Sequence, residues 1–176
     1  MLADVWETMA VDAAAESTLW ADCLLPEAER DGTAVFSPLG EERFALGLET
    51  IYEGYLVHYG RPRLFAPGDE DTALLLGDYL YAHGVARISA LREVAAVADL
   101  ADLISLCSQL RAEDAEGDGA LWAATAALLG RSELEEARNA LRLHSDPRRL
   151  EAAARSAAGD AEVDAALAAH AERRRA

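Results

Sequence analysis

The chain contains no lysine. All 16 of its basic residues are arginines, against 32 aspartates and glutamates, and the net charge is −16. Proteins that bind nucleic acid or anionic membranes need a basic surface. This charge therefore argues against both kinds of partner.

Cysteine is almost as scarce. Cys23 and Cys107 stand in apolar surroundings, without a C-x-x-C pair or a metal-ligand spacing, as small buried hydrophobic residues do. No apolar run approaches the roughly 20 residues of a membrane span. The N-terminus has acidic residues where a signal peptide has basic ones. We therefore expect a cytoplasmic protein without a membrane span.

β-Branched residues are sparse, and no stretch alternates polar and apolar residues with the period of a strand. Hydrophobic residues make up 52% of the sequence, and alanine, the best helix former, is the most frequent residue. The sequence predicts an all-α helical bundle in a single domain, residues 1–176, whose alanine-rich tail from 151 onward can fray.

Two apolar helices joined by a short connection form the most informative stretch of the chain. The first is expected within 41–59, and the second begins after Pro67 and Gly68 with Asp69 as its N-cap and continues to about residue 88. A connection of this length makes antiparallel neighbours of the two helices.

The remaining sequence also predicts helices, over 2–25, 90–111, 121–129, 132–144, 147–158 and 160–175. Ser89, Ser132 and Asp146 are the expected N-caps of three of them. In the helix from 90, an apolar stripe is expected to face the core; it consists of Leu91, Val94, Val97, Ala98, Ala101, Ile104 and Cys107/Ser108. The last helix ends in Arg173, Arg174 and Arg175, where cations complement the helix dipole without any ligand.

The central stretch carries sequence motifs that resemble those of a known protein family. Its residues are Ala45-Leu46-Gly47-Leu48-Glu49-Thr50-Ile51, Leu56-Val57-His58, Gly60-Arg61-Pro62 and Leu74-Leu75-Leu76-Gly77-Asp78-Tyr79-Leu80-Tyr81-Ala82. They resemble the first half of the trans-isoprenyl diphosphate synthases, the polyprenyl synthetase family. That family has a helix ALxLExIHxxxLxH, a linker with RRGxPT and a helix LLxGDYLxA. The resemblance covers roughly residues 40 to 110 and implies an all-helical, synthase-like fold.

One departure from the family decides the expected function. The DDxxD motif that should follow His58 is missing, and so are the family's diphosphate-binding lysines. Such enzymes neutralise a departing diphosphate with Mg²⁺ ions, which need several oxygen ligands. The resemblance therefore implies a non-catalytic protein without a cofactor, similar to the small subunits of two-component polyprenyl synthases. Its expected partner is a full-length synthase or another copy of the chain.

The resemblance also supplies candidate ligand-binding residues. Tyr52 and Tyr55 occupy the helix that lines the prenyl tunnel of the family, where bulky rings would shorten or plug it; they are also ordinary core aromatics. Arg61 and Arg63 can hold a diphosphate, or pair with the carboxylates of 69–71.

His58 and Asp78 complete the candidate set. His58 with His83 can ligate a metal or serve the structure only. Glu49 and Glu53, one helical turn apart, can bind a cation or form a solvated or interface face. Two alternatives to the subunit hypothesis remain open. One is a stand-alone isoprenoid-binding protein with a cavity at Tyr52 and Tyr55. The other is a residual prenyltransferase that holds Mg²⁺ with Glu49, Glu53 and the acidic residues 69–71.

Overall fold

The computed structural model describes residues 2–174, so Arg175 of the expected terminal cluster lies outside the described residues. Within this range the chain is helical and has no strand, only an isolated bridge between Leu24 and Phe65. The α-helices are α1 (Leu2–Glu16), α2 (Thr18–Asp22), α3 (Ala45–Tyr59), α4 (Glu70–Ala90), α5 (Val94–Ala112), α6 (Asp118–Ala127), α7 (Glu135–His144), α8 (Arg148–Ala158) and α9 (Asp160–Arg174). Short 3₁₀ turns lie at Glu27–Glu29, Ser37–Leu39 and Glu42–Phe44. The all-α prediction is confirmed.

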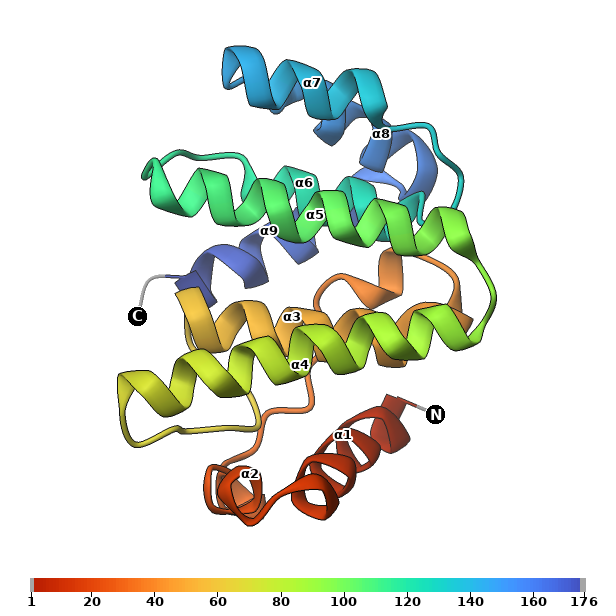
Figure 1. Cartoon of the computed structure of the whole chain (residues 1–176). Helices are drawn as coiled ribbons and strands as arrows, with labels where there is room; N and C mark the ends of the chain where they lie inside the picture. The colour runs from red at the N-terminus through yellow and green to blue at the C-terminus, as the bar shows by residue number, and fades with distance from the viewer. Residues whose placement is uncertain (1, 175–176) are drawn as a thin grey trace.

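The antiparallel pair α3 and α4 forms the middle layer of the molecule (Figure 1). Glycines let the two backbones approach closely at two points, where Gly47 meets Gly84 and Gly54 meets Gly77. The short connection after Tyr59 and the N-cap at Asp69, whose carboxylate accepts the N–H of Thr72 at 2.8 Å, position the second helix. The predicted packing of these two helices is therefore correct.

Two apolar cores lie on either side of this layer. Helix α6 is buried along almost its whole length among α5, α8 and α9, above α3 and α4 in Figure 1. The apolar segment 121–129 is therefore covered within the fold. A smaller core joins α1 and α2 to α4 and to the connection between α3 and α4; its buried residues include Trp6, Met9, Cys23, Leu64 and Phe65. No helix within 2–174 has both the length and the hydrophobicity of a membrane span.

The predicted helix 2–25 is wrong in one respect, because it is broken at Ser17. The Ser17 hydroxyl accepts the backbone N–H of Leu19 at 3.1 Å and caps α2. A serine side chain that bonds to nearby backbone competes with helix continuation. The first helix therefore divides into α1 and α2.

The predicted break at Ser89 is also wrong. Helix α4 continues to Ala90, and the chain turns at 91–93, where Arg92 has a φ of 61°. Part of the stripe predicted to face the core is therefore rotated outward: Val94 is 81% exposed, and Ala98 and Ala101 are exposed as well. Val97 and Ile104 are half-buried against the core, and Cys107 is buried as predicted. The buried face of α5 consists of Ala96, Asp99, Leu100, Leu103, Leu106, Cys107 and Leu110.

The later helix boundaries differ by one to three residues from the prediction. Ser132 adopts a left-handed φ of 55° and does not cap, so α7 starts at Glu135. Asp146, the expected N-cap, accepts the N–H of Arg148 at 3.1 Å but stands one position before Pro147, which is the N-cap of α8. The alanine-rich tail, expected to fray, is helical through Arg174, and Val163, Ala166 and His170 on α9 are buried.

Candidate functional site

A buried cation lies beside α3, on the connection that leads to α4. The guanidinium of Arg63 donates to Glu49 at 2.6 Å and to Glu53 at 2.9 Å, and all three side chains are at most 1% exposed. It also donates to the backbone oxygens of Thr33 and Glu49. Burial disfavours its charge, but the two carboxylates outweigh this and raise the pKa of Arg63.

Both carboxylates are bonded on their other sides as well. Glu53 accepts the backbone N–H groups of Arg63 and Leu64, each at 2.7 Å, and Glu49 accepts the N–H of Ser37 at 3.2 Å. The Arg63 guanidinium also lies over the rings of Trp6 and Tyr52, at 4.5 Å and 4.9 Å from their centroids. This network joins α1, α3 and two loops around one charge.

The positions of Glu49, Glu53 and the two arginines differ from the expectations drawn from the sequence. Glu49 and Glu53 do not form a solvated face, because both are buried. Arg63 does not pair with the acidic residues 69–71; its partners are on α3. Arg61, two residues earlier, is exposed, and its backbone N–H donates to the oxygen of Arg173 at 3.0 Å. The structure therefore separates the two arginines that the sequence suggested as one diphosphate site.

Tyr52 and Tyr55 lie in a second cluster, made of aromatic rings in the main core. The two tyrosine rings stack with centroids 6.0 Å apart, and both contact Trp122 of α6 edge-on. Phe36 stacks on Trp122 and meets Tyr52 edge-on. Neither tyrosine is more than 1% exposed. Rings therefore fill the space into which these side chains point.

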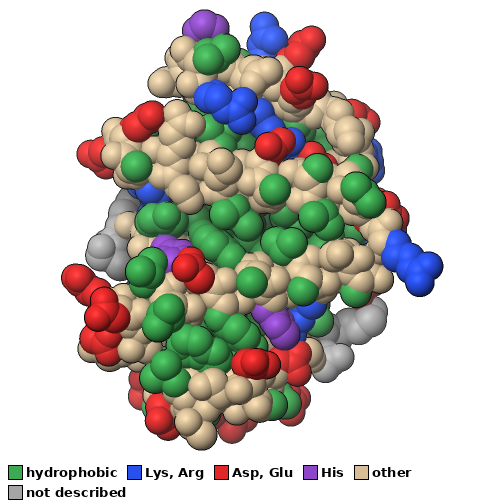
Figure 2. Space-filling view, viewed as in Figure 1, with side chains coloured by type: hydrophobic (Ala, Val, Ile, Leu, Met, Phe, Trp, Pro, Cys, Tyr) green, Lys and Arg blue, Asp and Glu red, His purple; other side chains and the backbone are tan. Residues whose placement is uncertain are grey.

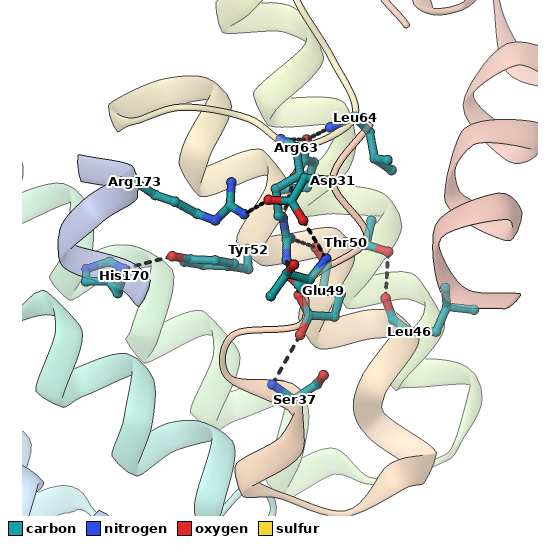
Figure 3. Close-up of polar contacts among 12 residues, drawn as sticks. Asp31, Ser37, Leu46, Glu49, Thr50, Tyr52, Arg63, Leu64, His170 and Arg173 are labelled. Atoms are coloured by element: carbon teal, nitrogen blue, oxygen red, sulfur yellow. Dashed lines mark hydrogen bonds and ion pairs between the residues drawn. The ribbon is translucent and has the colours of Figure 1, made fainter. Parts of the chain in front are cut away.

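Histidine and aspartate close this cluster on the side of α9. The Tyr52 hydroxyl is 2.9 Å from Nδ1 of His170, whose Nε2 lies 3.3 Å from the carboxylate of Asp118 (Figure 3 shows the first contact). The Tyr55 hydroxyl donates to the same carboxylate, and Arg174 donates to its other oxygen at 2.8 Å. Side chains from α3 and α9 thus converge on Asp118 at the start of α6.

The protonation states in this cluster follow from its contacts. Burial opposes a charged carboxylate, but the hydrogen bonds from His170 and Tyr55 and the charge of Arg174 hold the pKa of Asp118 well below its ordinary value. Burial and the neighbouring Asp118 raise the pKa of Tyr55, so that this hydroxyl stays protonated. A cavity of about 450 Å³, lined in part by Asp118, His170 and Arg174, opens beside the cluster.

The arginines at the end of α9 have specific partners, which the sequence did not predict. Arg173 is 7% exposed and donates to Asp31, which lies in the loop before α3 (Figure 3). Arg174 binds Asp118 at the start of α6. Besides complementing the helix dipole, these cations attach the last helix to two earlier parts of the chain.

His58 and Asp78 are neighbours. Their side chains lie 3.3 Å apart, with the imidazole ring packed where a Cβ of Gly77 would stand. Burial outweighs the attraction of Asp78 and lowers the pKa of His58, so the ring is uncharged near neutral pH. His83 lies elsewhere on α4, 3.8 Å from Asp12 of α1. The two histidines thus have different carboxylate neighbours, and the described residues hold no group of three or more potential metal ligands.

An apolar groove runs between α4 and α5. It has a volume of about 610 Å³ and is lined by Asp78, Tyr81, Ala82, Val85, Ala86, Ser89, Val97 and Ile104. Of the six candidate residues suggested by the sequence, only Asp78 borders it. The candidates do not come together in one site. His58 lies beside Asp78. Arg63 belongs to the buried arginine network, Tyr52 and Tyr55 belong to the aromatic core, and Arg61 is exposed on the connection between α3 and α4.

His170, Asp118 and Arg173 are the residues that sequence reasoning missed. Asp118 stands in an acidic stretch between two predicted helices, and His170 and Arg173 stand in an alanine-rich tail. The one available signal was the helical spacing that places His170 and Arg173 on the same face of the last helix as Val163 and Ala166. Comparison of the chain with models of protein families, with curated proteins and with solved structures finds no match.

Proposed function

We propose that the chain is a non-catalytic protein of the isoprenyl diphosphate synthase type, which acts as a regulatory or small subunit of a polyprenyl synthase in isoprenoid biosynthesis. The observation that carries this proposal is the closed network of Glu49, Arg63 and Glu53. It occupies the helix and linker that, in the resemblance, would hold the metal ions and the diphosphate.

The ion pairs of Arg63 with Glu49 and Glu53 support the non-catalytic assignment. For Mg²⁺ to bind at Glu49 and Glu53, it would have to displace Arg63 from a fully buried site. That would leave a guanidinium without its partners, a change that is strongly unfavourable inside a protein. The residual-prenyltransferase alternative loses two of its proposed metal ligands in this way. Asp69, a third proposed ligand, already caps α4.

The aromatic cluster supports the same assignment. A stand-alone isoprenoid-binding protein would need an apolar cavity next to Tyr52 and Tyr55. Both side chains are instead in contact with Trp122, and their hydroxyls bond to His170 and Asp118. Rings at this position match the plugged form of the family's tunnel, as expected for a protein that does not elongate a prenyl chain.

The proposal is tested with the full-length polyprenyl synthase of the same organism. The chain alone, given Mg²⁺, farnesyl diphosphate and isopentenyl diphosphate, is expected to form no prenyl product. Mixed with the synthase, it is expected to co-elute in size-exclusion chromatography and to change the rate or the length of the products. An acidic helical protein of similar size is the control for non-specific effects.

Either of two results would contradict the proposal. Turnover by the chain alone, lost in Glu49→Gln, would show that the carboxylates bind metal in spite of Arg63. A synthase that neither binds the chain nor changes its products would remove the subunit assignment.

A further inference from the structure

A cavity lies between α1 and the loop that joins α2 to α3. Its volume is about 410 Å³, within the range of small-molecule sites. Trp6, Ala10 and Val11 of α1, together with Leu64 from the connection between α3 and α4, form what we call its apolar wall. None of the six candidate residues suggested by the sequence lines this cavity. It therefore lies apart from the positions that the resemblance singles out.

Arg30 brings an unpaired positive charge to the cavity. Its Nε donates to the backbone oxygen of Leu25 at 2.8 Å, which fixes the plane of the guanidinium. Its two terminal nitrogens have no hydrogen bond or ion pair among residues 2–174. The other arginines in this range that form no ion pair are exposed, whereas Arg30 is half-buried. A guanidinium held in this way can donate two parallel hydrogen bonds to a carboxylate.

The indole of Trp6 adds a second donor without an acceptor. Its Nε1 is buried and has no hydrogen-bond partner in the described part of the chain. Gly32, which also lines the cavity, leaves room beside this ring, because a Cβ atom there would stand only 3.0 Å from Cδ1 of the indole. A buried donor without an acceptor costs free energy. A ligand that carries carboxylate oxygens would supply the missing acceptors.

Two carboxylates border the same cavity. Glu7 of α1 and Glu27 of the 3₁₀ turn are both exposed, and neither forms an ion pair with Arg30 or with any other described residue. The cavity thus presents charges of both signs that do not neutralise one another. A ligand that satisfies all of them must itself carry both signs.

We propose that this cavity binds a small zwitterion, an L-α-amino acid with an uncharged, apolar side chain. The terminal nitrogens of Arg30 donate to its α-carboxylate, and its α-ammonium group donates to Glu7 and Glu27. Its side chain packs on the apolar wall. The bond from Arg30 to the Leu25 oxygen holds the guanidinium in place before the ligand arrives, which lowers the cost of binding.

The surrounding charge disfavours the simpler ligands. On the face shown in Figure 2, acidic side chains surround the bottom of the molecule, where Figure 1 places α1 and α2, and the whole chain has a net charge of −16. A phosphate would gain Arg30 but would be repelled by Glu7, by Glu27 and by this field. A polyamine would be attracted by the two carboxylates but would leave Arg30 unpaired and repelled.

The test is isothermal titration calorimetry of the full chain with L-valine, L-leucine and L-methionine as separate probes. At least one of them is expected to bind with a dissociation constant of about 10 µM to 1 mM. L-Leucinamide lacks the carboxylate, and N-acetyl-L-leucine lacks the ammonium group. Each is expected to bind at least about tenfold more weakly than L-leucine, because each leaves one sign of charge in the cavity unpaired.

Variants test the same contacts from the side of the protein. Arg30→Gln should weaken binding of the amino acid by about tenfold, and so should the double variant Glu7→Gln/Glu27→Gln. Glu29→Gln is the matched control, since Glu29 belongs to the same 3₁₀ turn but does not line the cavity, and it should bind as the wild type does. Circular dichroism and thermal melting show whether each variant is folded.

The comparison of the two leucine derivatives keeps the proposal testable if a variant fails to fold. Three results would overturn the inference: no binding of any of the three amino acids at about 5 mM, binding of either derivative as tight as that of L-leucine, or binding unaffected by Arg30→Gln. The experiments contain no synthase and no prenyl diphosphate. Their failure would therefore leave the subunit proposal as it stands, and failure of that proposal would leave this one.

Discussion

The carbonyl oxygen of Gly47 on α3 lies 2.9 Å from the point where a Cβ atom of Gly84 on α4 would stand. Gly54 and Gly77 repeat this relationship about two helical turns away, where a Cβ of Gly54 would lie 2.9 Å from the Gly77 oxygen. Backbone thus touches backbone at two points along the central helix pair.

Replacing Gly84 with alanine tests how tightly this pair is packed. By intrinsic helix propensity alone, alanine would stabilise α4 by about 1 kcal/mol. The added methyl group would meet the Gly47 oxygen and the Ile51 side chain, so we expect a net destabilisation of about 1–3 kcal/mol. The measurement is urea unfolding.

Gly68→Ala is the matched control, since a Cβ there has no atom within 4 Å. Its free energy of unfolding should change by less than about 0.5 kcal/mol. A Gly84→Ala protein as stable as the wild type would mean that the helices separate without cost.

Arg63→Met tests the buried network. The substitution introduces an apolar side chain of similar length and leaves Glu49 and Glu53 buried without a cation. Loss of one partner from a buried ion pair costs about 3–5 kcal/mol. The expected result is a large decrease in the free energy of unfolding.

The control is Arg61→Met, two residues away and exposed, which should unfold within about 0.5 kcal/mol of the wild type. Equal stability of the two variants would rule out a stabilising role for the Arg63 pairs. Adding Glu49→Gln and Glu53→Gln to Arg63→Met should recover part of the lost stability, because those changes remove the unpaired charges.

The sequence predicts the helix pair α3 and α4 well because its signals are local. Proline and glycine at 67 and 68 stop the chain, Asp69 caps the next helix, and the connection is too short for any arrangement but adjacency. The network at Arg63 is not predictable in the same way. Periodicity assigns charged residues to the solvent side, and the burial of Glu49 and Glu53 results from loops that cover them only in the folded chain.

Helix α5 shows a different limit of sequence reasoning. Its apolar residues surround much of the helix, so more than one face satisfies the pattern for burial. The position of the turn at 91–93 decides which face of α5 points inward. Arg92 has a positive φ in this turn, and an arginine gives no clear sign in the sequence that a turn occurs there. Contacts between distant segments, such as Tyr52 with His170, leave no local signal at all.

The stability of the protein should decrease at acid pH, in part because Asp31 becomes protonated. Burial would raise the pKa of this carboxyl, but hydrogen bonds from Thr33 and Arg173 outweigh burial and lower the pKa from 3.8 to about 2. Because the folded state holds the proton less tightly than the unfolded state, the stabilisation is complete above the ordinary pKa. It is lost as the pH falls toward about 2.

Asp31→Asn should remove this part of the pH dependence. The measurement is the difference in melting temperature between wild type and variant, from about pH 7 in steps down to about pH 2. The difference should be largest near neutral pH and shrink through the interval between the two pKa values. A constant difference over the whole range would indicate that Asp31 acts through packing and not through its charge.

Both cysteines should be unreactive in the native protein. Cys23 and Cys107 are 5% and 1% exposed, and burial, together with nearby carboxylates, raises the pKa of each thiol. Since the thiolate is the reactive form, Ellman's reagent should label neither residue at about pH 8. Both should react at once in concentrated guanidinium chloride. Rapid labelling of either thiol without denaturant would show that its core opens locally.

The contacts of α9 also determine when the protein can finish folding during its synthesis. Tyr52 bonds to a residue 118 positions later, and Asp31 pairs with Arg173 at the end of the same helix. At about 5–20 residues per second, a ribosome needs roughly 6–24 s to translate the chain between the two partners. For this interval the rings of Phe36 and Tyr52 lack the helix that covers them on one side. The nascent chain thus presents an incomplete aromatic core to chaperones until its last helix is made.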